Sequence, residues 1–175
     1  RAEEAQQSKA STRQMRRAGG ADVSIHAKND DLFKMTLLLE ILDEHAVSLD
    51  FGMFLIIWLV QVIIYPVFLQ VKESDFVAWH HGYCSAIGFF VLPVMSLQLI
   101  ETASTCFFSG GYLSIAKIGS VIGAWIVTFL CSAPYHKKLQ KGKDFDVILR
   151  LIRTNWIRTI LWSLAFVLSV FSYYK

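Results

Sequence analysis

The sequence has few charged residues, few prolines and few glycines for its length. Only 18% of its 175 residues are Asp, Glu, Lys or Arg, and it contains three prolines and ten glycines. Disordered and collagen-like chains need many more of these residues, so both classes are excluded. Hydrophobic residues make up 54% of the chain, which is more than an ordinary soluble domain carries. The composition therefore predicts an integral membrane protein.

Cysteine is also scarce. The three cysteines, Cys84, Cys106 and Cys131, lie in apolar segments, and no C-x-x-C spacing occurs. An odd number without that spacing predicts no disulfide framework, so we expect buried free thiols. The sequence has no G-x-S-x-G, P-loop or G-x-G-x-x-G motif, and thus no recognisable catalytic set of a soluble enzyme. Its aromatic residues lie in the apolar part of the chain, away from any dense basic face, so we expect no nucleic-acid partner.

Four apolar runs are long enough to cross a bilayer. A helix of about 20 apolar residues spans the roughly 30 Å of hydrocarbon. The runs cover about residues 51–71, 82–108, 112–133 and 154–174. A segment in lipid must satisfy its own backbone hydrogen bonds, which only helices and closed barrels achieve. We therefore predict an all-α polytopic membrane protein, with a four-transmembrane-helix bundle over residues 47–175.

The first 50 residues have a different character. Residues 1–30 are polar and poor in bulky apolar groups, so we predict a flexible tail. In residues 31–46, apolar side chains recur at helical spacing: Leu32, Met35, Leu38, Leu39 and Leu42. This segment is too short and too charged to cross the membrane. We predict a short amphipathic surface helix that lies at the interface or packs against a partner.

Lysine and arginine are concentrated near two of the predicted loops. Six of them lie between residues 136 and 153, and Lys72 lies in the loop at residues 72–81. The opposite side has only Lys34, Lys117 and Lys175 near the span ends. Because inner loops carry the excess of positive charge, we place these two loops inside and both termini outside. The expected location is a bacterial inner membrane or the inner membrane of an organelle.

Antiparallel topology gathers polar residues from all four predicted spans at the inner face. Polar groups at membrane depth are costly, and they usually face the bundle interior and mark a site. The candidates for this polar cluster are Gln61, Tyr65, His80, His81, His136, Asn155 and Arg158, with Cys84 at the same end. The three imidazoles are candidate ligands for haem iron or another metal, and the other side chains would supply hydrogen bonds. The histidines also fit an ordinary interfacial role, because the sequence has no H-x-x-x-H or Cys/His spacing that indicates a particular metal.

Two charged residues lie in the apolar runs near the opposite face. Glu101 precedes Gly110 by nine residues, and Lys117 follows Gly111 by six. If the chain turns at these glycines, both side chains reach a similar depth. We expect a structural ion pair between Glu101 and Lys117, with a proton relay as the alternative.

Several short motifs resemble those of a family of small four-helix bacterial membrane proteins of unknown function, loosely akin to the anthrone oxygenase-like group. The motifs are W-x-x-Q-x-x-x-Y-P-x-F at residues 58–68, F-x-x-x-H at 76–80, H-x-x-L at 136–139, G-x-D at 142–144 and N-W-x-R-T at 155–159. The resemblance covers about residues 51–174 and implies a four-helix fold with a site at these polar positions. It implies no defined activity. Residues 1–50 depart from the family pattern, which leaves room for a role in docking.

Two functions follow from these patterns. The first is an accessory or structural subunit of a larger membrane complex of respiratory or photosynthetic type, with membrane lipid and other membrane protein subunits as partners. It is favoured by the N-terminal extension and by the absence of a recognisable catalytic set. The alternative is a membrane redox or oxygenase-like protein that binds haem, a metal or a quinone at the inner polar cluster. A transporter fits less well, because the four spans show no internal repeat and no row of charges.

Overall fold

The computed structural model describes Lys28 and residues 32–174, and in this part of the chain it contains helices and no strand. Four of the helical segments are long and apolar enough to cross a membrane: Ala46–Gln70, Glu73–Ser109, Tyr112–Leu139 and Phe145–Tyr173. The predicted all-α fold with four membrane-spanning helices is confirmed. The chain is an integral membrane protein.

Two of the spans are interrupted by a π-helical turn. The first span comprises α2 (Ala46–Leu59), the π turn η1 (Val60–Ile64) and α3 (Tyr65–Gln70). The second is the single helix α4 (Glu73–Ser109). The third comprises α5 (Tyr112–Val127), the π turn η2 (Thr128–Ser132) and α6 (Ala133–Leu139), and the fourth is α7 (Phe145–Tyr173).

The helices are longer than the apolar runs that predict them. The second run begins at residue 82 but α4 begins at Glu73, and the fourth begins at residue 154 but α7 begins at Phe145. The third run stops before Pro134, whereas the helix continues to Leu139. The first turns of α4 and α7 are polar and lie outside the hydrocarbon. A search for long apolar runs therefore does not include them. Pro134 does not end the span, because the turn before it widens and so relieves the crowding that the proline ring would cause.

The chain divides into two compact units, Arg1–Ile41 and Leu42–Lys175. In the first unit, the described residues 32–41 are helical and expose apolar side chains such as Leu32, Phe33 and Met35. The predicted flexible tail at residues 1–30 lies outside the described residues, apart from Lys28. In the second unit, helical residues 42–44 and a turn at His45 precede α2.

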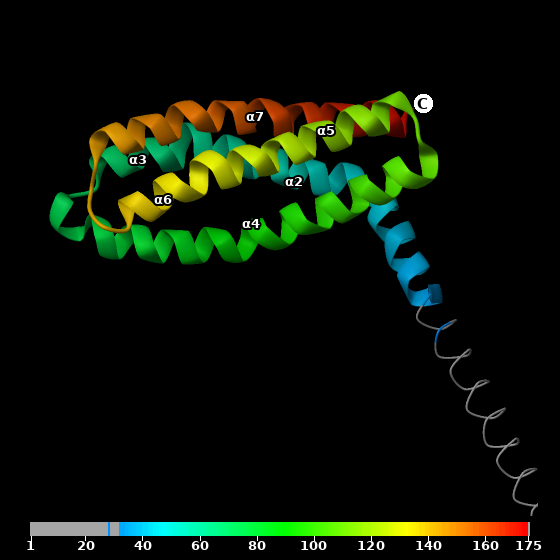
Figure 1. Cartoon of the computed structure of the whole chain (residues 1–175), viewed down its shortest axis with the longest axis horizontal. Helices are drawn as coiled ribbons and strands as arrows, with labels where there is room; N and C mark the ends of the chain where they lie inside the picture. The colour runs from blue at the N-terminus through cyan, green and yellow to red at the C-terminus, as the bar shows by residue number, and fades with distance from the viewer. Residues whose placement is uncertain (1–27, 29–31, 175) are drawn as a thin grey trace, which may run out of the picture. The chain divides into compact units, whose positions relative to one another are not determined.

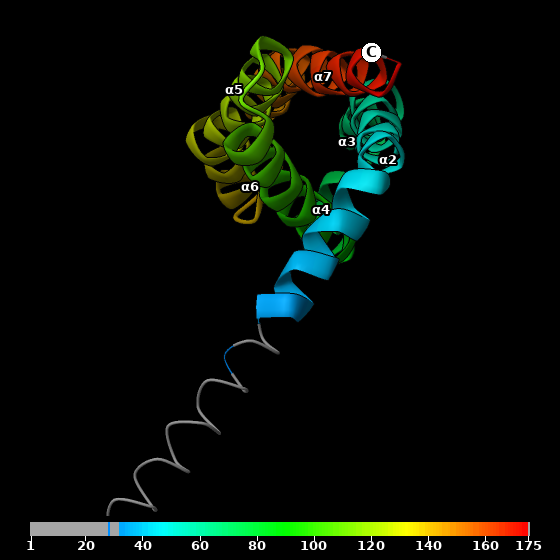
Figure 2. The same cartoon turned by 90° about the vertical axis from the view of Figure 1, so that its right-hand side faces the viewer.

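The four spans of the second unit are antiparallel and form a closed ring of neighbours (Figures 1 and 2). α4 and α7 each pack against both α2 and α5, so α4 lies opposite α7 across the bundle. Two buried apolar clusters fill much of the interior. One includes Phe68, Phe76 and Leu151, and the other includes Met53, Met95 and Trp162.

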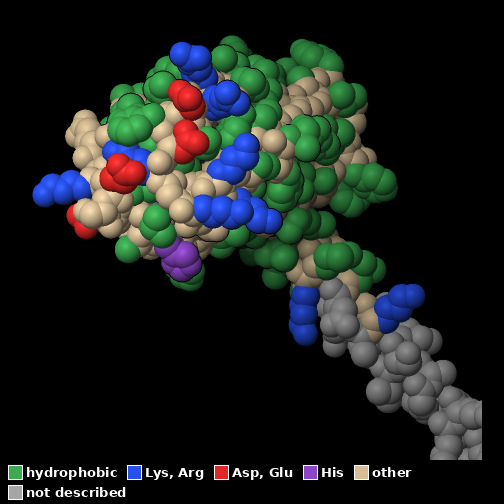
Figure 3. All heavy atoms as spheres, turned by 60° about the vertical axis from the view of Figure 1, so that its left-hand side comes forward, with side chains coloured by type: hydrophobic (Ala, Val, Ile, Leu, Met, Phe, Trp, Pro, Cys, Tyr) green, Lys and Arg blue, Asp and Glu red, His purple; other side chains and the backbone are tan. Residues whose placement is uncertain are grey.

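Local interactions fix the chain reversals. α4 ends at Gly110, whose φ of 59° is left-handed and therefore suits glycine. At the other end, the Asp144 side chain accepts a hydrogen bond from the Val147 backbone N–H and caps α7. Lys143 Nζ donates to the carbonyls of Leu69 and Val71 at 2.8 and 2.6 Å, which docks the α6–α7 loop on the end of α3. Lys and Arg side chains gather at this end of the molecule (Figure 3).

Each π turn is followed two residues later by a proline. The Tyr65 N–H bonds to the Val60 carbonyl ahead of Pro66, and the Ala133 N–H bonds to the Thr128 carbonyl ahead of Pro134. Proline lacks an N–H, and its ring crowds the carbonyl four residues earlier, so a widened turn relieves the conflict. Both wide turns place polar side chains toward the interior: Gln61 in η1 and Ser132 in η2 are buried.

Candidate functional site

A cavity of about 480 Å³ lies between the first span, α4 and the third span. Its long walls are apolar and include Met53, Ile57, Val60, Ile87, Val91 and Met95. At one end it is lined by polar side chains: Tyr65, Tyr83, Cys84, Ser132, His136 and Arg158. An apolar cavity with a few converging polar groups is the usual form of a small-molecule site. Three of the seven residues of the polar cluster expected from the sequence, Tyr65, His136 and Arg158, line this end.

Tyr65, His136 and His80 form a row of hydrogen bonds beside the cavity. The Tyr65 hydroxyl is 3.1 Å from His136 Nε2, and His136 Nδ1 is 3.0 Å from His80 Nε2. These residues come from α3, α6 and α4, so the row joins three spans. Tyr65 and His80 are almost completely buried. The Phe76 ring stacks on the His80 imidazole with centroids 5.4 Å apart, and this contact holds the imidazole in place.

Cys84 completes a compact group with the two histidines. Its Sγ lies 3.6 Å from His80 Nε2 and 3.7 Å from His136 Nδ1. The predicted metal candidates were His80, His81 and His136, but the His81 side chain is exposed and is not part of this group. Adjacent residues on a helix point about 100° apart, and here His80 faces the interior while His81 is exposed. The four-residue spacing of His80 and Cys84 is the signal that identifies the third member.

A second hydrogen-bonded chain leads from the first span to Arg158. Gln61 Oε1 accepts a bond of 2.8 Å from Asn155 Nδ2, and Asn155 Oδ1 accepts one of 2.9 Å from Arg158 Nη1. Gln61 Nε2 also donates to the Ile152 carbonyl at 3.3 Å. Gln61 therefore contacts α7, whereas Tyr65 contacts α6. The two residues therefore form hydrogen bonds with different partners, although their four-residue spacing predicts that they share a helix face.

Arg158 ends this chain at the cavity. Its Nη1 also donates to Ser132 Oγ at 3.4 Å, while its buried Nε has no hydrogen-bond partner in the described structure. No carboxylate forms an ion pair with Arg158 among the described residues. The polar end of the cavity therefore has a positive formal charge, held by neutral amides and hydroxyls. Such a group attracts an oxygen that accepts hydrogen bonds.

The structure brings Glu101 and Lys117 together near the opposite end of the bundle, and adds Asp50. Lys117 Nζ lies 2.8 Å from Glu101 Oε2 and 2.8 Å from Asp50 Oδ2. All three side chains are buried. Lys117 also reaches Ser169 of α7 at 3.4 Å, so this ion triad links all four spans. Asp50 immediately precedes the first apolar run, which is why the sequence does not mark it as a membrane-buried partner.

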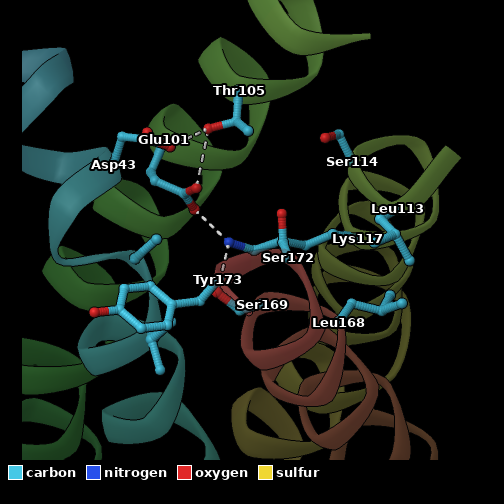
Figure 4. A pocket seen from close by; sticks show the side chains of 12 residues that line it. Asp43, Glu101, Thr105, Leu113, Ser114, Lys117, Leu168, Ser169, Ser172 and Tyr173 are labelled. Carbon is cyan, nitrogen blue, oxygen red and sulfur yellow. Dashed lines mark hydrogen bonds and ion pairs between the residues drawn. The ribbon is translucent and has the colours of Figure 1, made fainter. Parts of the chain in front are cut away.

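Neutral side chains complete the environment of the ion triad. Gln98 donates to Asp50, and the Thr102 and Thr105 hydroxyls donate to Glu101. A small pocket of about 130 Å³ reaches Glu101 and Lys117 from the side of Asp43 (Figure 4). Asp50 Oδ1 and both Glu101 oxygens thus accept hydrogen bonds from neutral groups, whereas Asp50 Oδ2 has the Lys117 ammonium beside it.

No protein-family model, curated protein or solved structure matches this chain. The site offers an apolar cavity, a guanidinium and hydroxyl donors at one end, and two imidazoles beside a thiol.

Proposed function

We propose that the protein binds an apolar molecule of the quinone class within the membrane, with the oxygen-bearing ring at the polar end of the cavity. The observation that carries this proposal is the cavity of about 480 Å³, apolar along its walls and polar at one end. This volume lies within the range typical of small-molecule sites, about 300–1,000 Å³. Tyr65 and Arg158 supply donors for carbonyl oxygens, and Met53, Val91 and Met95 provide apolar walls for the ring and tail.

The arrangement favours a quinone over a haem held by both histidines. The imidazole nitrogens of His80 and His136 are 3.0 Å apart and bond to each other. Two axial ligands of a haem iron must instead lie on opposite faces of the macrocycle. A quinone needs only hydrogen-bond donors and an apolar wall. The row from Tyr65 through His136 to His80 additionally offers a path along which a proton can move beside the ring.

Filling the cavity tests the proposal. A Cβ atom built on Gly88 meets no atom within 4 Å, and Gly88 lines the cavity. We expect Gly88→Leu to occupy the binding space without a backbone clash and to weaken binding of a decyl-substituted benzoquinone by about tenfold or more. Calorimetry on the full chain in lipid nanodiscs measures the dissociation constant.

Gly82→Leu is the matched control. Gly82 lies on the same helix, is exposed, and also has nothing within 4 Å of an added Cβ. It should bind the quinone as the wild type does. No binding by the wild type, or equal losses in the two variants, would contradict a quinone site in this cavity.

We also propose an association with other membrane subunits, which one observation favours. In the most apolar stretch of α4, only 11% of the residues are buried inside the protein. In the corresponding stretches of the other three spans, 22–33% are buried. α4 thus leaves an apolar surface, including Phe89, Phe90 and Leu92, for lipid or for a neighbouring helix. A co-purifying membrane protein in mild detergent would support this accessory role.

A further inference from the structure

We infer that His80, Cys84 and His136 form a binding site for a transition-metal ion with two nitrogen ligands and one sulfur ligand. The three side chains come from α4 and α6, and their potential ligand atoms all lie within 4.8 Å of one another. This group lies at the edge of the cavity. A role of this group in the chemistry of a bound quinone rests on the proposed function. The binding of a metal ion does not depend on it.

The distances within the group match one face of a metal-coordination tetrahedron. Metal–nitrogen bonds of about 2.0 Å and metal–sulfur bonds of about 2.3 Å give tetrahedral edges of about 3.3 Å between nitrogens and 3.5 Å between nitrogen and sulfur. The corresponding distances are 3.0 Å between His80 Nε2 and His136 Nδ1, and 3.6 and 3.7 Å from these atoms to Cys84 Sγ. These distances differ from the tetrahedral edges by about 0.1–0.3 Å, and the two rings must turn so that their nitrogens face the ion instead of each other.

The surroundings already orient the ligands. His136 would use Nδ1 for the metal, which leaves its Nε2 bonded to the Tyr65 hydroxyl at 3.1 Å. A hydrogen bond from the second ring nitrogen is the usual way in which a metal-bound imidazole is held. The His80 ring contacts both Phe76 and Phe68, at centroid distances of 5.4 Å in each case. Both imidazoles are therefore restrained before any metal arrives.

The donor set selects the kind of metal. Two imidazoles and a thiolate suit Zn²⁺ or copper, whereas Mg²⁺ and Ca²⁺ prefer oxygen ligands. On binding, the Cys84 thiol loses its proton to solvent, and the hydrogen bond between the histidines is replaced by two metal–nitrogen bonds. Cys84 and His136 also line the cavity, so a fourth ligand can reach the ion from there. Three protein ligands with an accessible fourth position are typical of reactive rather than structural zinc sites.

Cobalt titration tests this inference without any quinone. The full chain, purified in detergent and stripped with chelator, is titrated with Co²⁺. We expect one equivalent to produce visible d–d bands of a tetrahedral ion and a near-ultraviolet thiolate-to-cobalt band, both displaced by Zn²⁺. Cys84→Ser should lose the thiolate band, and His80→Gln should weaken cobalt binding at least tenfold.

Matched variants separate ligand loss from misfolding. Cys131→Ser and His81→Gln change the same residue types outside the group and should titrate like the wild type. Circular dichroism and thermal unfolding establish that each variant is folded. Absence of the bands in the folded wild type, or a thiolate band that survives in folded Cys84→Ser, would overturn the metal site. Cobalt binding without quinone binding would retain the metal site and reject the proposed cavity function.

Discussion

Lys117 and Arg158 are buried cations within the described spans, and the chain satisfies them in different ways. Lys117 faces two carboxylates, Asp50 and Glu101, each at 2.8 Å. Arg158 is held by the neutral groups of Asn155 and Ser132. When all its members are ionised, the ion triad has a formal charge of −1, whereas Arg158 keeps its positive charge. The former is suited to holding helices together, and the latter is suited to attracting a ligand oxygen.

Removal of the Lys117 ammonium should destabilise the protein strongly. Lys117→Met leaves two buried carboxylates without a counter-charge, and loss of one partner from a buried ion pair costs about 3–5 kcal/mol. We expect a marked fall in the midpoint of thermal unfolding in detergent. The triple variant Lys117→Met, Asp50→Asn, Glu101→Gln removes all three charges and should recover much of that loss. A single variant as stable as the wild type would show that the ion triad is not structural.

At the scale of elements, the two π turns decide which residues reach the polar end of the cavity. A π turn accommodates one extra residue, and therefore changes the direction of the side chains that follow relative to a regular helix. In the first span, the π turn lets Gln61 form a hydrogen bond with Asn155 on α7, while the Tyr65 hydroxyl forms one with His136 on α6. In the third span, the π turn η2 lies directly before α6, which carries His136. Such turns often occur at functional sites.

Pro66→Ala should remove the cause of the first π turn. Alanine restores a backbone N–H and relieves the crowding at Val62, so the helix can become regular and rotate Tyr65 by about 100° relative to Gln61. We expect quinone affinity to fall by about tenfold, with thermal stability retained because alanine favours helix. Calorimetry and thermal unfolding provide the two readouts.

Pro93→Ala serves as the control for the π turn. Pro93 is inside α4, where the helix has no π turn, and its side chain is exposed. Its replacement should leave quinone affinity unchanged. If Pro66→Ala also binds with wild-type affinity, then the first π turn does not position the site.

The sequence predicts the elements well where length and hydropathy decide, and less well where packing decides. Each apolar run exceeds the membrane thickness, so the four spans follow directly. The depth of Glu101 and Lys117 follows from the glycine turn between them. The spacing of Cys84 and His80 places both on one helix face, but Ser132 is not marked by the sequence, because its contact with Arg158 depends on which helices face each other. The π turns escape prediction because proline alone does not say whether a helix kinks, ends or widens.

At the scale of the whole molecule, the four spans separate two buried polar groups. The ion triad lies toward the α4–α5 turn, and the cavity with its histidines and Arg158 lies toward the loops that carry most lysines and arginines. The predicted orientation places those loops inside, and it stays a prediction, as does the type of membrane. The cavity is the feature behind the proposed ligand binding, and the exposed apolar surface of α4 is the feature behind the proposed association with other subunits.

Native mass spectrometry of the protein released from its own membranes in mild detergent tests the central claim most directly. We predict a species heavier than the protein alone by the mass of one quinone-class molecule, and loss of that extra mass in Gly88→Leu but not in Gly82→Leu. A co-purifying subunit would add support for the accessory role. A wild-type chain that carries no such molecule, or an added mass that survives in Gly88→Leu, would contradict the claim that this cavity holds a ligand.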